Sequence, residues 1–182
     1  ETVIILIRVF KNKEDKIRFK EKFCFFSKKR RKGKLIWFHG SSVGEIMSII
    51  PIINEYEKKN SIGTILITSS TLSSSKVLEK IKFKKVIHQF YPIDHIIFSK
   101  KFLSYWKPSK AIFLESEIWP SMFKSLKIKN IPLILLNARI TPKTYNRWQK
   151  LDKFSHSIFN LISIAYPQNN DTKEFLKQLN VK

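Results

Sequence analysis

Residues 37–45, with the sequence WFHGSSVGE, combine the residue types that acid–base chemistry on a hydroxyl group requires. An apolar run leads into a small-residue turn, whose glycines let the backbone bend sharply and let a ligand approach it closely. Ser41 and Ser42 offer hydroxyl and N–H groups beside Gly44, and Glu45 offers a carboxylate. A helix starting here would favour the ionised carboxylate at its positive end. Because a general base must be ionised to accept a proton, Glu45 is a candidate for that role.

The same spacing is that of a capping box. Ser42 would be the residue preceding the first helical turn, and Glu45 would be the third residue of the helix. Such boxes are common at helix starts, so spacing alone favours capping over catalysis. The two roles are compatible, because a capping carboxylate is also held at the positive end of the helix.

A second acidic segment, Glu115-Ser116-Glu117-Ile118-Trp119-Pro120, follows another apolar run. Extended residues two apart face the same way, so Glu115 and Glu117 are expected to point into one cleft. Two near carboxylates would perturb each other's pKa values. The alternative is that one of them caps the helix that Pro120 begins and the other pairs with a lysine.

Two other polar segments follow apolar runs. Residues 68–75 form a hydroxyl-rich helix start, suited to an anion or to sugar hydroxyls, although ordinary N-capping also explains it and is favoured. Arg139 is suited to a phosphate or carboxylate, with an ion pair to Glu117 as the structural alternative. Thr68, Thr71 and Arg139 are therefore candidate binding residues.

Short apolar runs alternate with amphipathic stretches along most of the chain. They predict strands at 34–39, 63–68, 85–89, 110–114, 132–136 and 162–166, and helices at 43–59, 71–81, 95–105, 120–128, 143–156 and 171–179. This alternation predicts an α/β fold, with a parallel sheet of about six strands and helices on both faces. The carboxyl ends of such strands meet at one edge, where the polar segments would gather.

The charge balance is strongly basic, with 35 basic against 14 acidic residues and a formal net charge of +21. Nucleic acid, an anionic membrane surface or a phosphorylated substrate would each fit this excess. We find no zinc-finger spacing, RNP-type aromatic motif or helix-turn-helix, so no nucleic-acid partner is expected. The densest basic run, residues 28–32, favours anionic lipid, with a solvated loop as the alternative.

Residues 1–33 are predicted to be a basic, membrane-proximal segment with an amphipathic helix over 14–26. Its stripe of Phe19, Phe23 and Phe26 fits packing against the domain and contact with lipid equally well. The apolar run at 3–7 is far too short to span a bilayer. Because no initiating Met precedes it, we expect it to be the tail of a longer hydrophobic segment.

The single cysteine, Cys24, excludes a disulfide framework and a thiolate metal site. It is expected to be a small buried residue among phenylalanines. The four histidines show no metal-ligand spacing, so no metal or other cofactor is expected.

In their order and spacing these motifs resemble the N-terminal domain of the 3-deoxy-D-manno-octulosonic acid (Kdo) transferases of Gram-negative lipopolysaccharide synthesis. The resemblance covers nearly the whole chain and rests on Lys13-Glu14-Asp15, residues 37–45, Thr68 to Thr71, His88-Gln89, Tyr91-Pro92-Ile93-Asp94, residues 115–120, Asn137-Ala138-Arg139 and Gln168. It implies the N-terminal half of a GT-B glycosyltransferase. Residues 34–182 would be its Rossmann-like acceptor-binding domain, and a C-terminal CMP-Kdo-binding domain is absent from this sequence.

The resemblance also implies a reaction, the transfer of Kdo from CMP-Kdo to a lipid A precursor at the cytoplasmic face of the inner membrane, without a metal. Glu45 matches the catalytic base of the family and Glu117 its second acidic residue. The residues expected to bind the acceptor are Ser41, Ser42, Gly44, Thr68, Thr71 and Arg139. The alternatives are a non-catalytic membrane- or anion-binding module, a truncated relic, and a nucleic-acid-binding protein.

Three features differ from the family pattern. Gly40 stands where Ala is usual, and Ser74 stands where Gly is usual. The sequence ends at Lys182, before any donor domain, so we expect this segment alone to be inactive.

Overall fold

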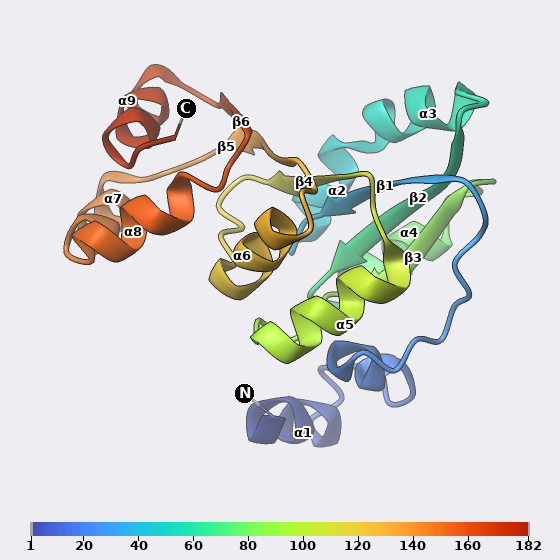
Figure 1. Cartoon of the computed structure of the whole chain (residues 1–182). Coiled ribbons are helices and arrows are strands. Elements are labelled where there is room, and N and C mark those ends of the chain that lie inside the picture. Colours follow the sequence, from blue (N-terminus) through green and yellow to red (C-terminus); the bar gives the residue numbers. More distant parts are fainter. Residues whose placement is uncertain (1, 182) are drawn as a thin grey trace.

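A six-stranded parallel sheet organises the computed structural model, which describes residues 2–181 (Figure 1). The strands are β1 (Lys34–His39), β2 (Ile62–Ser69), β3 (Val86–Phe90), β4 (Lys110–Leu114), β5 (Leu133–Ala138) and β6 (Ile164–Pro167). They lie in the order β3-β2-β1-β4-β5-β6, and all neighbours are parallel. The predicted α/β class and the predicted strands are confirmed. Glu1 and Lys182, at the outer ends of the expected domains, lie outside the described residues.

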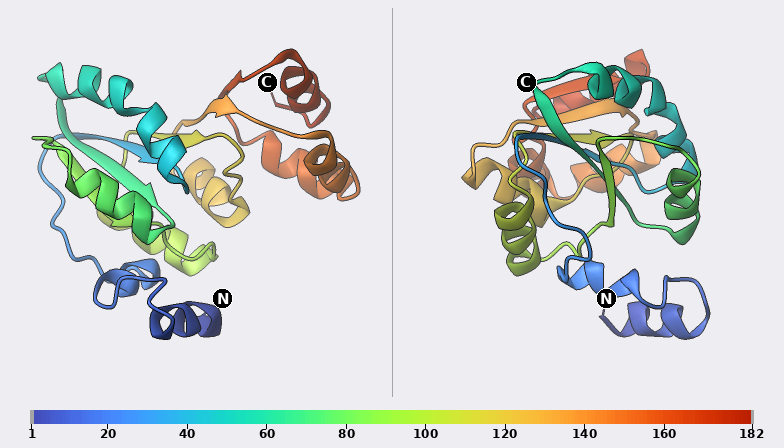
Figure 2. Two further views of the ribbon diagram at one scale, coloured as in Figure 1. Left: turned by 180° about the vertical axis from the view of Figure 1, so that it is seen from behind. Right: turned by 90° about the vertical axis from the view of Figure 1, so that its right-hand side faces the viewer.

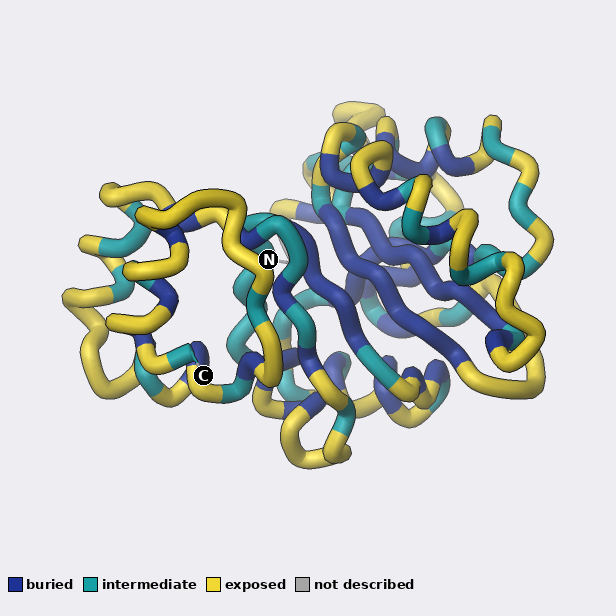
Figure 3. The backbone as a smooth tube through the Cα atoms, turned by 90° about the horizontal axis from the view of Figure 1, so that it is seen from above, coloured by how far each residue is buried: buried dark blue, intermediate teal, exposed yellow. Residues whose placement is uncertain are grey.

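Helices cover both faces of the sheet. The α-helices are α1 (Thr2–Phe10), which belongs to the N-terminal segment, and α2 (Val43–Ser48), α3 (Ile50–Lys58), α4 (Leu72–Glu79), α5 (Ile96–Trp106), α6 (Pro120–Ile128), α7 (Pro142–Gln149), α8 (Asp152–Phe159) and α9 (Asn170–Gln178). The core on one face joins the sheet to α2, α3 and α4, and the core on the other joins it to α5, α6, α8 and α9. Figure 3 shows the central strands buried between the two layers. Burial of both strand faces explains their near-continuous apolar sequences.

Two predicted helices are divided in the structure. The helix expected over 43–59 breaks at Ile49, which ends α2 and precedes α3. Pro51 in the first turn of α3 lacks an amide hydrogen and would clash with the carbonyl four residues earlier, so it cannot continue α2. The helix expected over 143–156 is split into α7 and α8 by a tight turn, in which the N–H of Leu151 donates to the carbonyl of Trp148 over 2.9 Å.

The prediction of an amphipathic helix over 14–26 is wrong. The structure has a short 3-10 helix, η1 (Arg18–Phe23), and the α-helix in the N-terminal segment is α1. The Asp15 carboxylate accepts the N–H groups of the next turn, and Cys24, at φ 58°, ends η1 in the left-handed region. Glu14 and Glu21 are buried in tertiary contacts, and these replace a regular amphipathic face.

The aromatic stripe of the N-terminal segment packs against α5. The Phe26 ring stacks on Tyr105 with centroids 3.9 Å apart, and Phe23 meets Phe98 edge-on at 6.0 Å. Cys24 is buried, as expected, and burial raises the pKa of its thiol to about 12. The views in Figure 2 show this segment at one end of the molecule, with an extended connection leading into β1.

That connection crosses the start of β2 at very close range. A Cβ added at Gly63 would lie 2.4 Å from the Lys32 carbonyl oxygen, so only glycine fits there. Gly33, at φ +96°, provides the turn into β1. Both glycines serve the entry of the N-terminal segment into the sheet.

Candidate functional site

Polar segments follow β1, β2, β4 and β5 at the carboxyl edge of the sheet. The order of the strands reverses between β1 and β4, and ligands of open α/β sheets bind outside the strand ends at such a point. His39 ends β1 opposite Thr68 of β2 and Phe113 of β4. The turn with Glu45 therefore starts beside the strand that leads to Glu117.

Glu45 forms the predicted capping box with the turn that precedes α2. Its Oε2 accepts the N–H of Ser41 over 2.9 Å, and its Oε1 accepts the N–H of Ser42 over 3.3 Å. In return the Ser42 hydroxyl accepts the N–H of Glu45 over 3.1 Å. The capping interpretation is confirmed. Glu45 is 9% exposed, and its carboxylate lies against the turn, not free in solvent.

The two glycines of this turn differ in what surrounds them. A Cβ on Gly40 would lie 2.8 Å from Leu114 Cδ1 and 3.3 Å from Glu45 Oε2, so its absence lets the carboxylate pack against the backbone. A Cβ on Gly44 would meet only Ser42 Oγ, at 3.9 Å. No close packing contact requires glycine at position 44, and the missing side chain leaves an exposed backbone surface at the start of α2.

Glu117 is held by side chains from outside its own turn as well as within it. Its Oε2 accepts N–H groups from His39 Nε2 over 3.1 Å and from Trp119 Nε1 over 2.8 Å. Burial by itself would raise the pKa of Glu117, but the hydrogen bond and charge of His39, with hydrogen bonds from Ser41 and Trp119, hold it below its usual value. The carboxylate is therefore ionised at neutral pH.

His39 belongs to a buried polar chain that ends at Glu117. Its Nδ1 lies 2.9 Å from the Thr68 hydroxyl oxygen, which also accepts the Trp37 indole N–H over 2.9 Å. Because a carboxylate can only accept, Nε2 carries the hydrogen directed at Glu117. The imidazole also stacks on Tyr91, with ring centroids 3.9 Å apart.

The structure places Thr68 differently from the expectation that it binds the acceptor. Its side chain is fully buried, and its hydroxyl is used by Trp37 and His39. Thr68 thus positions His39, and direct contact with a ligand is not supported. Trp37 and His39 were not among the residues predicted from the sequence, although they lie two residues apart on the same face of β1. Their spacing of two residues in a predicted strand was the sequence signal that could have identified them.

Ser41 lies between the two carboxylates. Its N–H donates to Glu45, while its hydroxyl contributes to the low pKa of Glu117 and lies 3.2 Å from the Ser70 hydroxyl. Thr71 caps α4, as the capping alternative predicted, and also donates to the Ser41 carbonyl over 3.3 Å. The segments after β1 and β2 therefore meet at Ser41, and the segment after β4 joins them through the bond of Glu117 to His39.

The remaining expectations concern Glu115 and Arg139. Glu115 lies in the left-handed region at φ 50°, so the rule that extended residues two apart share a face does not apply to it and Glu117. Arg139 is exposed, and the ion pair with Glu117 that was its structural alternative does not form between these described residues. The Arg139 backbone hydrogen-bonds to Glu115 and Ser116, which keeps the residue at the same edge of the sheet.

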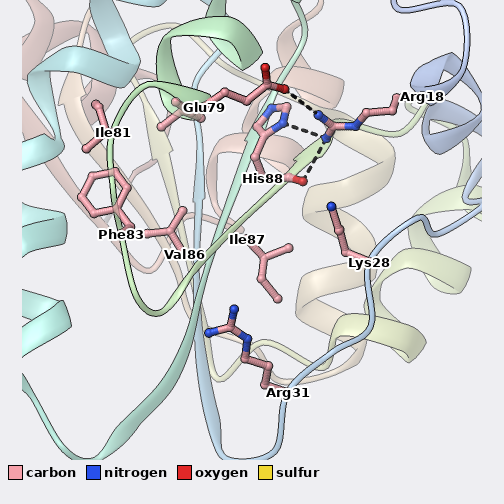
Figure 4. Close-up of a pocket in the computed structure, with 10 residues that line it drawn as sticks. Arg18, Lys28, Arg31, Glu79, Ile81, Phe83, Val86, Ile87 and His88 are labelled. Carbon is pink, nitrogen blue, oxygen red and sulfur yellow. Dashed lines mark hydrogen bonds and ion pairs between the residues drawn. The ribbon is translucent and has the colours of Figure 1, made fainter.

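A basic pocket of about 290 Å³ lies away from this edge, beside strand β3 (Figure 4). The N-terminal segment contributes Arg18 to it, and the facing wall includes Glu79 and His88. The guanidinium nitrogens of Arg18 are all engaged, with Glu21, Ser75, Glu79 and His88. Burial and Arg18 lower the pKa of His88 to about 3, so the neutral ring accepts from Arg18. Arg18 therefore fixes η1 to β3 and has no donor to spare for an anion.

In residues 2–181 no three or more His, Cys, Asp or Glu side chains are grouped so that they could hold a metal ion. Within the same range, no helix combines the length and the apolar character needed to cross a bilayer.

Comparison with known proteins identifies a family. The family model described as 3-Deoxy-D-manno-octulosonic-acid transferase (kdotransferase) matches residues 17–182. A 3-deoxy-D-manno-octulosonic acid transferase of Rickettsia bellii is 38% identical over 174 residues, which is 95% of this chain and 41% of the relative. The probable mitochondrial transferase of Arabidopsis thaliana is 40% identical over 72% of this chain and 29% of its own length. The Haemophilus influenzae transferase is 26% identical over 74% of this chain and 32% of its own length.

A solved structure shares the fold. UDP-GlcNAc 2-epimerase from Neisseria meningitidis, bound to UDP-GlcNAc, aligns with a TM-score of 0.56 and 15% identity. The alignment covers 83% of this chain and 44% of the epimerase chain. At this identity the likeness concerns the fold alone, and it agrees with the Rossmann-like order of the six strands.

Proposed function

The chain belongs to the family of 3-deoxy-D-manno-octulosonic acid transferases, and we propose that it supplies the acceptor site and the general base of an enzyme that transfers Kdo from CMP-Kdo to a lipid A precursor. One observation of the structure supports the proposal above the others. Glu45 accepts the N–H of Ser41, and Glu117 accepts from His39, two residues before Ser41 at the end of β1, so the two candidate carboxylates lie at one edge of the sheet. The chain spans 41% of the Rickettsia bellii relative, and the donor domain is proposed to lie in the length it does not cover.

In the proposed reaction Glu45 removes the proton from an acceptor sugar hydroxyl. The hydroxyl oxygen forms a bond to the anomeric carbon of Kdo, the bond from that carbon to the phosphate of CMP breaks, and CMP leaves as an anion. The capping box does not preclude this role, because each carboxylate oxygen retains a lone pair after accepting one N–H. The position at the start of α2 favours the ionised form that must accept the proton.

Glu117 is proposed to orient the acceptor. It is ionised at neutral pH, and both His39 and Trp119 bond to its Oε2, so lone pairs on Oε1 remain for a hydroxyl of the sugar. Because the polar chain behind it is buried and already hydrogen-bonded, Glu117 presents a preorganised acceptor that needs little rearrangement when substrate binds.

The other proposed contacts lie around these carboxylates. Ser41, Ser42, Gly44 and Thr71 border the turn, and the exposed guanidinium of Arg139 suits a phosphate of the acceptor. The net charge of +21 supports attraction to anionic lipid at the cytoplasmic face of the inner membrane. Helix α1 adds exposed apolar side chains to that proposed membrane contact, with Ile4 at 60% and Phe10 at 87% exposure.

The test is reconstitution of the transfer with the full-length enzyme. With CMP-Kdo and a lipid A precursor, we expect CMP to be released and the acceptor to gain the mass of Kdo in mass spectrometry. Omission of either substrate should prevent both changes. An enzyme that binds the precursor but never modifies it would favour the non-catalytic alternative and reject the proposal.

A further inference from the structure

An apolar pocket of about 200 Å³ lies between α1 and the segment that follows β3. Its apolar walls are Ile4, Ile5, Pro92, Ile93 and Trp119. Resting on the proposed function, we propose that this pocket binds one acyl chain of the acceptor while the sugar lies at the two carboxylates.

The pocket adjoins the candidate site through two of its lining residues. Trp119 donates its indole N–H to Glu117, and Ser70 lies 3.2 Å from the hydroxyl of Ser41. A chain attached to a sugar beside Glu117 therefore has an apolar surface next to it. Trp119 and Ser70 thus connect the pocket to the groups around Glu117 and Ser41.

Charged groups at the pocket are already paired, which leaves it suited to a neutral chain. The Lys22 ammonium donates to Glu14 over 2.8 Å and to the Ser70 carbonyl over 3.2 Å. The Asp94 carboxylate accepts the N–H groups of Ser121 and Met122 at the start of α6. Since neither charge is free, the gain on binding comes from removal of apolar surface from water.

One residue that lines the pocket carries a polar group with no partner among the residues that the structure describes. This group is the hydroxyl of Tyr91, which is buried and forms no hydrogen bond within residues 2–181. A buried donor left unpaired costs free energy, so a carbonyl that reached it would be bound favourably. This distinguishes an acyl chain, which carries a carbonyl at its attachment point, from a plain alkyl chain.

Helix α1, which forms one wall of the pocket, is bonded to residues on the opposite wall. Arg8 of α1 bonds to Glu14 over 2.7 Å, and Glu14 bonds to Lys22, which reaches Ser70. The inner face of α1 buries Ile5 at 8% exposure, whereas Ile7 on the same helix is 48% exposed. These two isoleucines provide a matched pair for separating the pocket from the outer surface of α1.

The experiment measures tryptophan fluorescence of the full-length enzyme with N-dodecanoyl glucosamine that is brominated along its chain, used below its micelle concentration. Bromine quenches only indoles that it approaches closely, so we expect saturable quenching that is lost in Trp119→Phe, in which Trp37, Trp106 and Trp148 remain. The unbrominated compound should reverse the quenching, and glucosamine alone should not. Quenching that persists in Trp119→Phe would place the chain elsewhere and overturn the proposal.

Substitutions in α1 then test whether the side chains that line the pocket bind the acyl chain. Ile5→Asn should weaken binding about tenfold, because it places an amide on the apolar surface, while Ile7→Asn should leave binding within about twofold. Ile5→Phe, which stays apolar but fills the space, should also weaken binding, and thus controls for misfolding of α1. Equal loss in the Ile5→Asn and Ile7→Asn variants would instead make α1 a general lipid-surface contact and overturn the pocket.

The Tyr91→Phe variant tests the carbonyl. It should weaken binding of the N-dodecanoyl compound several-fold and leave binding of the N-dodecyl analogue unchanged. The reconstituted transfer separates the two proposals. An enzyme that transfers Kdo without quenching of Trp119 would refute the pocket alone, and quenching without transfer would refute the proposed function alone.

Discussion

The two candidate carboxylates are held in opposite ways. Glu45 bonds to backbone N–H groups three and four residues before it, within one turn. Glu117 bonds to His39, which lies 78 residues earlier on another strand, and to Trp119. The first arrangement is local and can form as soon as α2 forms. The second exists only when β1, β2 and the segment after β4 are assembled.

This difference predicts that substitutions near the two carboxylates will have different effects on activity and stability. A change at Glu45 or its cap should act on one turn and on the chemistry there. A change in the chain Trp37–Thr68–His39 should reach Glu117 through the core and affect stability as well, because the groups are buried and both Thr68 and His39 serve two partners. The predictions below test this contrast, beginning with the largest expected effect.

The Glu45→Gln substitution should lower kcat of the full-length enzyme by about 10³-fold, since it removes a general base while the amide oxygen can still accept one of the two N–H groups of the cap. The loss of stability should be smaller than in Glu45→Ala. Glu45→Ala should lose as much activity and also about 1 kcal/mol of stability, because the cap is lost. If Glu45→Gln kept near-normal turnover, Glu45 would have only its capping role.

The His39→Phe substitution should raise the pKa of Glu117, because burial of the carboxylate remains while its main stabilising partner is lost. If ionised Glu117 orients the acceptor, the acid limb of the profile of kcat/KM against pH should move to higher pH, with activity at neutral pH reduced about tenfold. The same change at His156, on the surface of α8, is the control. An unmoved acid limb would show that Glu117 does not depend on His39.

The His39→Phe substitution should also change how the free energy of unfolding depends on pH. The folded-state pKa of Glu117 lies below its ordinary value of 4.5, so the ionised form contributes stability above that pH and loses it as pH falls through the lower folded value. The difference in free energy of unfolding between wild type and His39→Phe should therefore be largest above pH 4.5 and narrow in acid. Urea titrations across this range measure it, and a difference independent of pH would contradict the stabilisation of ionised Glu117 by His39.

The Thr68→Val substitution should cost about 1–3 kcal/mol in urea unfolding, because it leaves the buried Trp37 indole N–H without an acceptor. Activity should fall several-fold through the loosened His39, with little change in KM. Ser42→Ala is the matched control from the local arrangement and should cost about 1 kcal/mol through loss of the N-cap. A larger effect on KM than on kcat would restore a direct role of Thr68 in binding.

The Gly44→Ala substitution should raise the free energy of unfolding by about 0.5–1 kcal/mol, since the added Cβ meets only Ser42 Oγ, at an ordinary contact distance of 3.9 Å, and alanine favours the helix. KM for the acceptor should nevertheless rise, because the methyl group covers backbone that the sugar is proposed to approach. Gly63→Ala is a contrast, expected to destabilise strongly, since its Cβ would lie 2.4 Å from a backbone oxygen. Unchanged KM in Gly44→Ala would remove Gly44 from the acceptor site.

Prediction from the sequence worked best where a pattern is repeated or local. The strand bounds agree within two residues because apolar runs covered on both faces are distinctive. It failed for the N-terminal segment, where Glu14 and Glu21 look like the polar face of a helix but are buried partners of other elements. It failed also for Glu115, whose left-handed conformation is set by the turn after β4 and not by strand alternation.

By itself, the sequence determined the parallel α/β sheet, the capping box at Glu45 and the family, because these follow from periodicity, short-range spacing and motif order. Only the tertiary structure decided that Glu117 meets the end of the strand that leads to Glu45, that His39 and Thr68 support Glu117, and that α1 closes a pocket beside Trp119. The physical reason is the distance along the sequence between the groups that interact. A hydrogen bond within one turn is encoded by neighbours, whereas a bond between strands depends on the register of the whole sheet.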